Sequence, residues 1–231
     1  MINISILGLS HQGLVFAAFF AKLNLKVICF DNKINRIKKL KKDNITDEVE
    51  FEPNLKKQLS NKNLFFTSDI TKIKKSNTIL ICEDVLIKSD GSKNDKQIIN
   101  LINILNKINF NHVVNIILFS QINPGFSRFY SKKLINNKKV NFFYSPDILT
   151  IGEALKVLNE KKIFFVGGAK KKININSKKI LDDFFKIIKK RYIFSTYESV
   201  ELTKEAIQLK LAMDVTFVNI ISDYIDLNDD Y

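Results

Sequence analysis

Residues near the amino terminus have the types and spacing of a phosphate-binding turn. Gly8 permits a tight turn after an apolar run, and Gly13 lets the following helix pack closely against the strand. The backbone N–H groups at the start of that helix attract a diphosphate. Asp31 follows Gly13 by 18 residues, against ~20 expected of a carboxylate that bonds ribose hydroxyls. This pattern predicts a dinucleotide site, and the acid at Asp31 favours NAD over NADP because it repels a 2′-phosphate.

Three further residues complete the turn, and a fourth follows the acid. Ser10 stands where the usual pattern has its middle glycine, and a side chain there is expected to stand between the backbone and the pyrophosphate. Gln12 is included in the predicted cofactor site. His11 either donates to a phosphate or faces solvent, and the sequence leaves both open. Lys33, two residues after Asp31, is included in the predicted cofactor site.

The elements that position these residues follow from the alternation of apolar, β-branched runs with amphipathic stretches. The pattern predicts an α/β fold, with a doubly wound, mainly parallel Rossmann-type sheet and a long C-terminal helix. The expected strands are Ile2–Leu7, Lys26–Phe30, Leu64–Thr67, Thr78–Cys82, Val113–Phe119, Val140–Tyr144, Ile163–Val166 and Tyr192–Phe194. The expected helices are residues 12–23, 33–42, 54–60, 93–108, 125–136, 153–158 and 176–189.

The last segment differs from the rest of the chain. Ser195 with Glu198 three residues later has the pattern of a capping box. Apolar residues then recur at helical spacing, with neither proline nor glycine to the end of the sequence. A helix of about thirty residues would extend roughly 45 Å, longer than the sheet domain needs. We therefore expect a dinucleotide-binding domain at 1–195 and a helix at 196–231 that associates with a partner.

Composition limits the remaining function classes. The 231 residues carry a net charge of +13, which attracts polyanions. The lysines are scattered along the chain, so nucleic-acid binding is not favoured. The apolar stretch 14–21 is too short to span a membrane, and His11 and His112 stand alone, so no metal site is predicted. A strand order of 3-2-1-4 would separate Cys29 and Cys82 by roughly 9–10 Å, which favours free thiols and a cytoplasmic protein.

Five motifs together resemble the UDP-glucose/GDP-mannose dehydrogenase family of nucleotide-sugar dehydrogenases, from Met1 to about Asn219. GLSHQGLVFAAFFA (8–21) resembles the family's GLGYVGLVxAxxxA, and FEPNL (51–55) resembles its YEPGL. SPDILTIGEAL (145–155) resembles its (N/S)PEFLREGxAL, and Gly167-Gly168 matches the glycines of its V(I/V)GG. ESVELTKEAIQLKLAMDVTFVN (198–219) resembles its ESAExxKYxxNxFLAxKIxFxN. The resemblance implies a twofold NAD-dependent oxidation of a sugar C6 hydroxyl, with a cysteine thiolate holding the aldehyde. It also implies that the long helix is a dimerisation helix.

The resemblance implies catalytic roles for three residues. Lys204 matches the lysine of the central helix that stabilises an oxyanion, although an ordinary exposed lysine is an equally good interpretation. Asp147 replaces the glutamate of the PEF motif and keeps its charge. Gln208 replaces the asparagine one turn after the lysine and keeps its amide. Ile151, by contrast, stands where the family has the glutamate of REG, so that carboxylate is lost.

The cofactor positions carried over by resemblance are also altered. Cys82 matches the cysteine of the family's CVGT segment, and Gln121 stands for the threonine of its STVP segment. Glu83 and Asp84 place two carboxylates where backbone passes close to the cofactor, and carboxylates repel a pyrophosphate. The cysteine nucleophile has no counterpart in this sequence, since Cys29 and Cys82 map to strand positions.

Two main hypotheses follow. The first is the NAD-binding portion of a nucleotide-sugar dehydrogenase, truncated and incomplete on its own, that binds NAD and a UDP- or GDP-sugar. It would act as a homodimer through the 196–225 helix or with a separately encoded C-terminal half. The second is a catalytically inactive, dimeric nucleotide-binding or interaction protein that has decayed from that family. The 3-hydroxyacid and 6-phosphogluconate dehydrogenases share the glycine turn, but the FEP and SPDIL motifs (51–53 and 145–149) argue against them.

Overall fold

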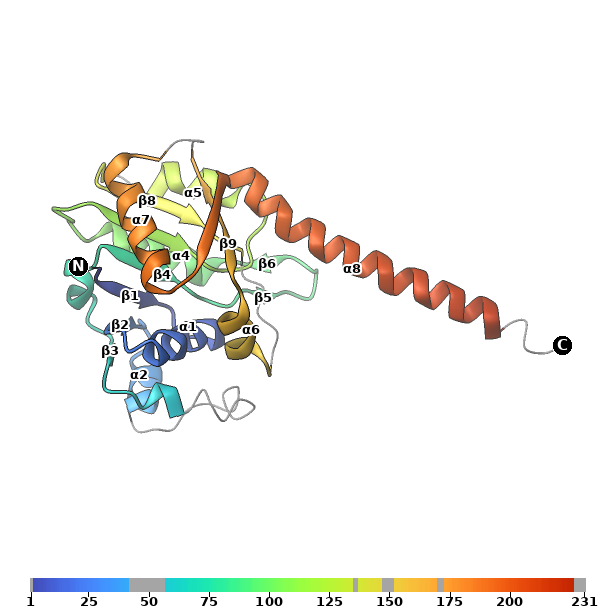
Figure 1. The fold of residues 1–231 in the computed structure, drawn as a ribbon, viewed down its shortest axis with the longest axis horizontal. Helices are drawn as coiled ribbons and strands as arrows, with labels where there is room; N and C mark the ends of the chain where they lie inside the picture. Colours follow the sequence, from blue (N-terminus) through green and yellow to red (C-terminus); the bar gives the residue numbers. More distant parts are fainter. Residues whose placement is uncertain (1, 42–56, 135–136, 147–151, 170–172, 227–231) are drawn as a thin grey trace.

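The computed structural model of this chain has an eight-stranded sheet covered by helices, and the carboxyl-terminal helix extends away from it (Figure 1). The structure describes residues 2–41, 57–134, 137–146, 152–169 and 173–226. Asp147 and Ile151, and the FEPNL motif at 51–55, therefore lie outside the described residues. None of the helices in the described part of the chain combines the length and hydropathy that crossing a bilayer requires.

The strands of the large sheet run in the order β10-β9-β8-β7-β4-β1-β2-β3. Their bounds are β1 Ile4–Leu7, β2 Val27–Phe30, β3 Leu64–Thr67, β4 Thr78–Ile81, β7 Val114–Leu118, β8 Val140–Tyr144, β9 Ile163–Gly168 and β10 Arg191–Thr196. The pairings are parallel except between β8 and β9. The predicted 3-2-1-4 order is confirmed, and the strand order reverses between β1 and β4, the point where open α/β sheets bind ligands.

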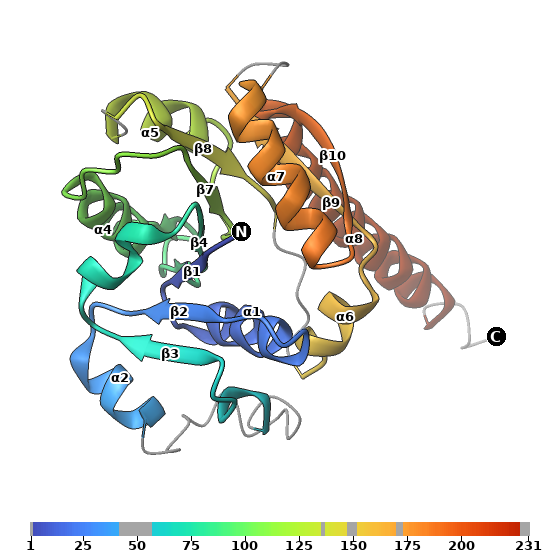
Figure 2. The same cartoon turned by 60° about the vertical axis from the view of Figure 1, so that its left-hand side comes forward.

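Helices cover both faces of this sheet (Figure 2). Their bounds are α1 His11–Lys22, α2 Ile34–Lys41, α4 Lys96–Asn106, α5 Phe126–Leu134, α6 Ala154–Glu160, α7 Ile175–Ile187 and α8 Tyr197–Asp226, with a short 3₁₀ helix at Ile70–Lys75. One apolar core joins the sheet to α1, α2, α6 and α7. A second core joins the opposite face to α4, α5 and the first turn of α8. The predicted doubly wound α/β fold is confirmed.

The differences from the sequence prediction are local. The helix expected at 93–108 begins only at Lys96, because Lys93–Asn94 (β6) pairs with Leu86–Ile87 (β5) as a small antiparallel hairpin. That hairpin carries too few apolar residues to be recognised from hydrophobic pattern alone. Cys29 and Cys82 are buried free thiols, as expected.

The start of α8 also differs from the prediction. Ser195 lies within β10, and the helix begins at Tyr197. The hydroxyl of Thr196, rather than that of Ser195, accepts a hydrogen bond from the backbone N–H of Ser199 at 3.4 Å. The expected capping box is therefore wrong, and Glu198 is used in an ion pair instead.

Candidate dinucleotide-binding site

The predicted cofactor residues meet at the carboxyl edge of the sheet. Gly8 follows β1 directly, Asp31 follows β2, Cys82 follows β4, and Gln121 comes shortly after β7. Because these four strands are parallel neighbours, their carboxyl ends share one edge. That edge includes the reversal between β1 and β4, the general position of a nucleotide in such folds.

The glycine turn brings strand and helix as close together as a polypeptide allows. Gly8 has a φ of +87°, a conformation that favours glycine. A Cβ on Gly13 would lie only 1.9 Å from the carbonyl oxygen of Gly8 and 3.0 Å from that of Cys82. Both glycines are therefore required by the backbone itself. The amino terminus of α1 is held directly at the end of β1 as a result.

The Ser10 side chain is turned into the protein. Its hydroxyl donates to the carbonyl oxygen of Cys82 at 3.3 Å and accepts from the backbone N–H of Asp84 at 2.9 Å. It makes no side-chain cap to α1. The expectation that this side chain would stand over the pyrophosphate position is wrong, because the loop after β4 engages it. The backbone N–H groups of the first turn of α1 lack intrahelical acceptors by geometry, and they remain a suitable anion site.

Asp31 is held rigidly by three donors. It is 2% exposed. It accepts hydrogen bonds from the backbone N–H of Leu9 at 3.0 Å and of Lys33 at 2.8 Å, and from Nη1 of Arg36 at 3.0 Å. Lys33 thus takes part through its backbone, while its side chain is exposed. Arg36 was missed by sequence reasoning, although its place in the first turn of α2, five residues after the acid, was a usable signal.

Glu83 adds a second buried carboxylate to this side of the site. Its Oε1 lies 3.9 Å from Nη1 of Arg36. The serine after β7, Ser120, fixes its backbone by donating to the Glu83 carbonyl oxygen at 2.8 Å. Burial raises the pKa of the Glu83 carboxyl to about 7, with Asp31 adding to the rise and Arg36 opposing it. The carboxylate expected from the sequence is therefore present at the site, with altered acidity.

A small polar pocket lies beside the first turn of α1. It has a volume of about 100 Å³ and is lined by Gln12, Asp84, Val85 and Gln121. Gln12 is 2% exposed, and its Nε2 has no hydrogen-bond partner among the described residues. Two predicted cofactor residues, Gln12 and Gln121, are thus brought together. The pocket lies toward β4 and β7, whereas Asp31 lies at the end of β2.

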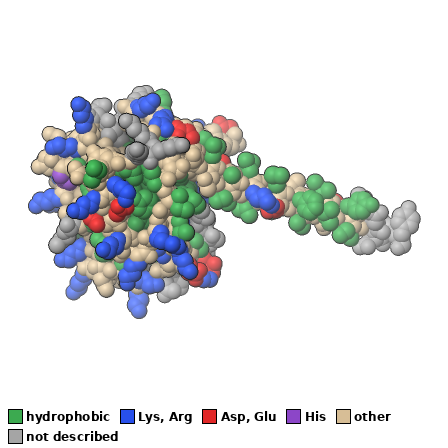
Figure 3. All heavy atoms as spheres, turned by 45° about the horizontal axis from the view of Figure 1, so that its top comes forward, with side chains coloured by type: hydrophobic (Ala, Val, Ile, Leu, Met, Phe, Trp, Pro, Cys, Tyr) green, Lys and Arg blue, Asp and Glu red, His purple; other side chains and the backbone are tan. Residues whose placement is uncertain are grey.

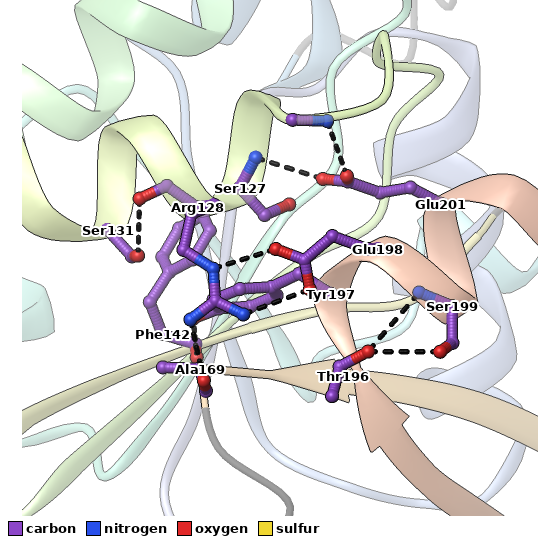
Figure 4. Close-up of polar contacts among 11 residues, drawn as sticks. Ser127, Arg128, Ser131, Phe142, Ala169, Thr196, Tyr197, Glu198, Ser199 and Glu201 are labelled. Atoms are coloured by element: carbon purple, nitrogen blue, oxygen red, sulfur yellow. Dashed lines mark hydrogen bonds and ion pairs between the residues drawn. The ribbon is translucent and has the colours of Figure 1, made fainter.

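The first turns of α8 pack against the loop that carries Gln121. Glu201 is buried and accepts from the backbone N–H groups of Gly125 at 2.7 Å and Ser127 at 2.9 Å (Figure 4). Glu205 pairs with Lys93 at 2.8 Å, and the same ammonium group donates to the carbonyl oxygen of Ile122 at 3.2 Å. These contacts fix α8 against the loop after β7.

The predicted catalytic residues on α8 differ in how far this packing buries them. Lys204 lies between Glu201 and Glu205 in sequence and is half-buried on the packed part of α8. Gln208 lies one turn further along and is exposed. The structure therefore places Lys204 on the helical segment nearest the Gln121 loop. The position of Asp147 falls outside the described residues.

An arginine fork fixes the direction in which α8 leaves the sheet. Arg128 donates from Nε and Nη2 to the two carboxylate oxygens of Glu198, at 2.7 and 2.9 Å, and from Nη1 to the carbonyl oxygen of Ala169 at 2.6 Å (Figure 4). These bonds lower the pKa of Glu198 to about 2. The Tyr197 hydroxyl donates to the carbonyl oxygen of Phe142 at 2.6 Å. The first turn of α8 is therefore anchored to α5, β8 and β9.

Known proteins are similar to this chain in sequence and in fold. The family model for the NAD-binding domain of the UDP-glucose/GDP-mannose dehydrogenase family matches residues 2–188. An uncharacterized protein of Methanocaldococcus jannaschii is 24% identical over 223 residues, covering 94% of this chain and 24% of that protein. YtcA of Bacillus subtilis, whose name marks it as a proposed UDP-glucose 6-dehydrogenase, is 27% identical over 224 residues, covering 94% of this chain and 51% of that protein.

Solved structures extend the likeness to the fold. A GDP-mannose dehydrogenase from Pseudomonas aeruginosa has a TM-score of 0.80 at 20% identity, covering 94% of this chain and 52% of its own. A UDP-glucose dehydrogenase from Pyrobaculum islandicum has a TM-score of 0.78 at 20% identity, covering 96% and 52%. The chain thus spans between a quarter and about half the length of these four proteins. It belongs to the UDP-glucose/GDP-mannose dehydrogenase family and carries the NAD-binding domain of that family.

Proposed function

We propose that this chain is the NAD-binding portion of a nucleotide-sugar dehydrogenase-like oxidoreductase that oxidises a CH–OH group of a UDP- or GDP-linked sugar. The observation that carries the proposal is the buried Asp31 carboxylate beside a turn in which Gly13 has no room for a side chain. In this proposal the diphosphate lies on the amino terminus of α1, and Asp31 accepts from the ribose hydroxyls. Bound NAD supplies the hydride acceptor.

The substrate side of the proposal rests on Lys204. Its position on the packed part of α8, beside the Gln121 loop, suits a cation that stabilises negative charge developing on a sugar oxygen. Gln208 and Asp147 are proposed to assist in orienting the sugar. Neither Cys29 nor Cys82 suits a thiolate role, because both are 0% exposed and burial raises the pKa of Cys29. A thiolate step would need a cysteine other than these two.

The assembly in this proposal is a homodimer in the cytoplasm, formed through the helix at 196–225. Large apolar side chains are exposed along the second half of α8, as Figure 3 shows for the face in view. The residues Leu211, Val215 and Val218 are 60%, 61% and 63% exposed. An apolar surface of this extent marks an interaction site. A separately encoded C-terminal half is the competing occupant.

A calorimetric titration of NAD and of NADP into the full chain tests the cofactor proposal. NAD should bind, NADP should bind at least ~tenfold more weakly, and Asp31→Ala should weaken NAD by a similar factor, since hydrogen bonds to a charged group contribute ~1.5–3 kcal/mol. Asp90→Ala, which removes an exposed acid of the β5–β6 turn, is the matched control.

The result that would overturn the proposal is the absence of heat at millimolar NAD from a chain whose circular dichroism shows the α/β fold. A dehydrogenase fold without its cofactor would then favour the inactive interaction protein. Sedimentation of the same sample distinguishes the homodimer from a monomer that awaits a second half.

A further inference from the structure

Two buried carboxylates share one guanidinium group at the adenosine side of the candidate site. Arg36 lies 3.0 Å from Asp31 Oδ2 and 3.9 Å from Glu83 Oε1. Both carboxylate side chains are nearly inaccessible, at 2% and 8% exposure. The closer and better aligned contact is the hydrogen bond to Asp31. One positive charge therefore faces two acids, and Glu83 is the acid that is less well compensated.

Glu83 also lies over the glycine turn. Its Oε2 is 2.6 Å from the point where a Cβ on Gly8 would be. In a fold of this kind, the backbone of that turn is where a diphosphate approaches most closely. A second anion placed there would face an ionised Glu83 across a short distance in a partly desolvated site. Coulomb repulsion in such a setting is several-fold stronger than in water.

We propose that Glu83 sets the affinity of this site for a dinucleotide, because its carboxyl group must carry a proton when the diphosphate is bound. This inference rests on the proposed function. When Glu83 is ionised, binding takes up one proton from solvent, which converts the carboxylate to a neutral carboxyl group. The nucleotide itself is not altered.

The charges around Glu83 decide whether this proton is available near neutral pH. Arg36 and Lys33, from α2 and the loop before it, favour the ionised form, and Asp31 and Asp84 favour the protonated form. Burial is the largest effect, and together with the two acids it outweighs Arg36 and Lys33 and raises the pKa of Glu83 to about 7. Below pH 7 the carboxyl is already neutral and affinity should be constant. Above pH 7 each unit should weaken binding about tenfold.

Calorimetric titration of NAD into the full chain between about pH 6 and 8.5 tests this inference. The wild-type affinity should fall about thirtyfold over that range, as expected for one group that titrates at about 7. Glu83→Gln, which keeps the shape and removes the charge, should bind equally well across the range. Asp90→Asn, which removes an exposed acid of the β5–β6 turn, should keep the wild-type slope.

Proton uptake gives a second measurement that needs no variant. In buffers of different ionisation enthalpy at about pH 8, wild-type binding should take up close to one proton. Absence of uptake, or a slope retained by Glu83→Gln, would overturn the inference while NAD binding itself stands. Absence of NAD binding at every pH, in folded wild-type and Glu83→Gln proteins alike, would overturn the proposed function and this inference with it.

Discussion

Helices α1 and α8 both carry many apolar side chains, which are buried in α1 and exposed along most of α8. Residues 12–21 of α1 are all buried between the sheet and α6. Residues 206–225 of α8 are all exposed, although they include Leu211, Phe217 and Ile221. The apolar side chains of α1 are covered within the domain, whereas those of α8 form the surface on which the proposed function places a partner.

The same contrast separates the candidate dinucleotide site from the region that the proposed function assigns to the substrate. The dinucleotide site is enclosed by residues that already hold each other, as the three donors around Asp31 show. On the α8 side, the segment around Lys204 is held by the loop after β7 and by Lys93 of β6. In the proposed function, residues of this domain hold the cofactor, and the partner that covers α8 completes the substrate side.

The largest expected effect comes from breaking the packing of α1. Phe20 is 0% exposed and contacts the rings of Phe16, Phe19 and Phe184. Phe20→Ala should lower the free energy of unfolding by about 3–5 kcal/mol, because it leaves a cavity in a close-packed core. Urea denaturation, at a concentration where the chain is monomeric, measures it. The matched control, Phe217→Ala on α8, should change the value by less than ~0.5 kcal/mol; an equal loss would contradict the contrast.

A smaller effect is expected when charge is placed on α8. Leu211 and Val218 lie on one face of α8, two helical turns apart. Changing both to Asp should weaken self-association at least ~hundredfold while the monomer stays folded. Sedimentation velocity over a concentration series measures the change. Asn219→Asp adds one negative charge at an exposed polar position and should leave association nearly unchanged. A dimer that survives the double change would show that this face is not the interface.

The acidity of Glu83 predicts a pH-dependent stability. Its pKa is raised from 4.5 to about 7, so the folded state binds more protons than the unfolded state between these values, and stability falls as pH rises. Glu83→Gln should therefore be more stable than wild type at pH ~8, by about 3 kcal/mol, and nearly equal to it at pH ~4.5. Urea denaturation at the two pH values measures the difference. A constant difference would contradict the altered acidity.

The smallest expected effect concerns the anchor of α8. Arg128→Ala should lower the free energy of unfolding by about 1 kcal/mol, since solvent screens a half-exposed pair. Because the pKa of Glu198 is lowered to about 2, the contribution is present above its usual value of 4.5 and is lost as pH falls toward 2. Thermal denaturation at pH ~3 and ~7 measures it. Lys156→Ala, in an exposed pair with Glu153, should have no measurable effect.

The sequence predicted the fold well because period and order are local signals. Strands such as Val27–Phe30 are continuous apolar runs, and Gly8, Gly13 and Asp31 have a fixed spacing along one strand-turn-helix-strand unit. Side-chain partners between distant segments were not predictable in this way. The inward turn of Ser10 depends on residues 82–84, and the position of Arg36 over Asp31 depends on how α2 packs.

The acidity of the site was the hardest feature to predict. The sequence shows two adjacent acids at Glu83 and Asp84, but only the structure shows that the first is buried and the second exposed. The two adjacent acidic residues are therefore expected to affect a bound anion differently. Burial is a property of the packed loop after β4, which Ser120 holds in place.

Hydrogen exchange of the full chain with and without NAD tests the central claim most directly, because it reports both regions in one experiment. At pH ~6 and saturating NAD, backbone amides at 8–13, 31–36 and 82–85 should exchange more slowly, whereas those at 206–225 should be unchanged. Protection confined to the glycine turn and its neighbours would place the cofactor at this edge of the sheet. Unchanged exchange at the glycine turn would contradict the account.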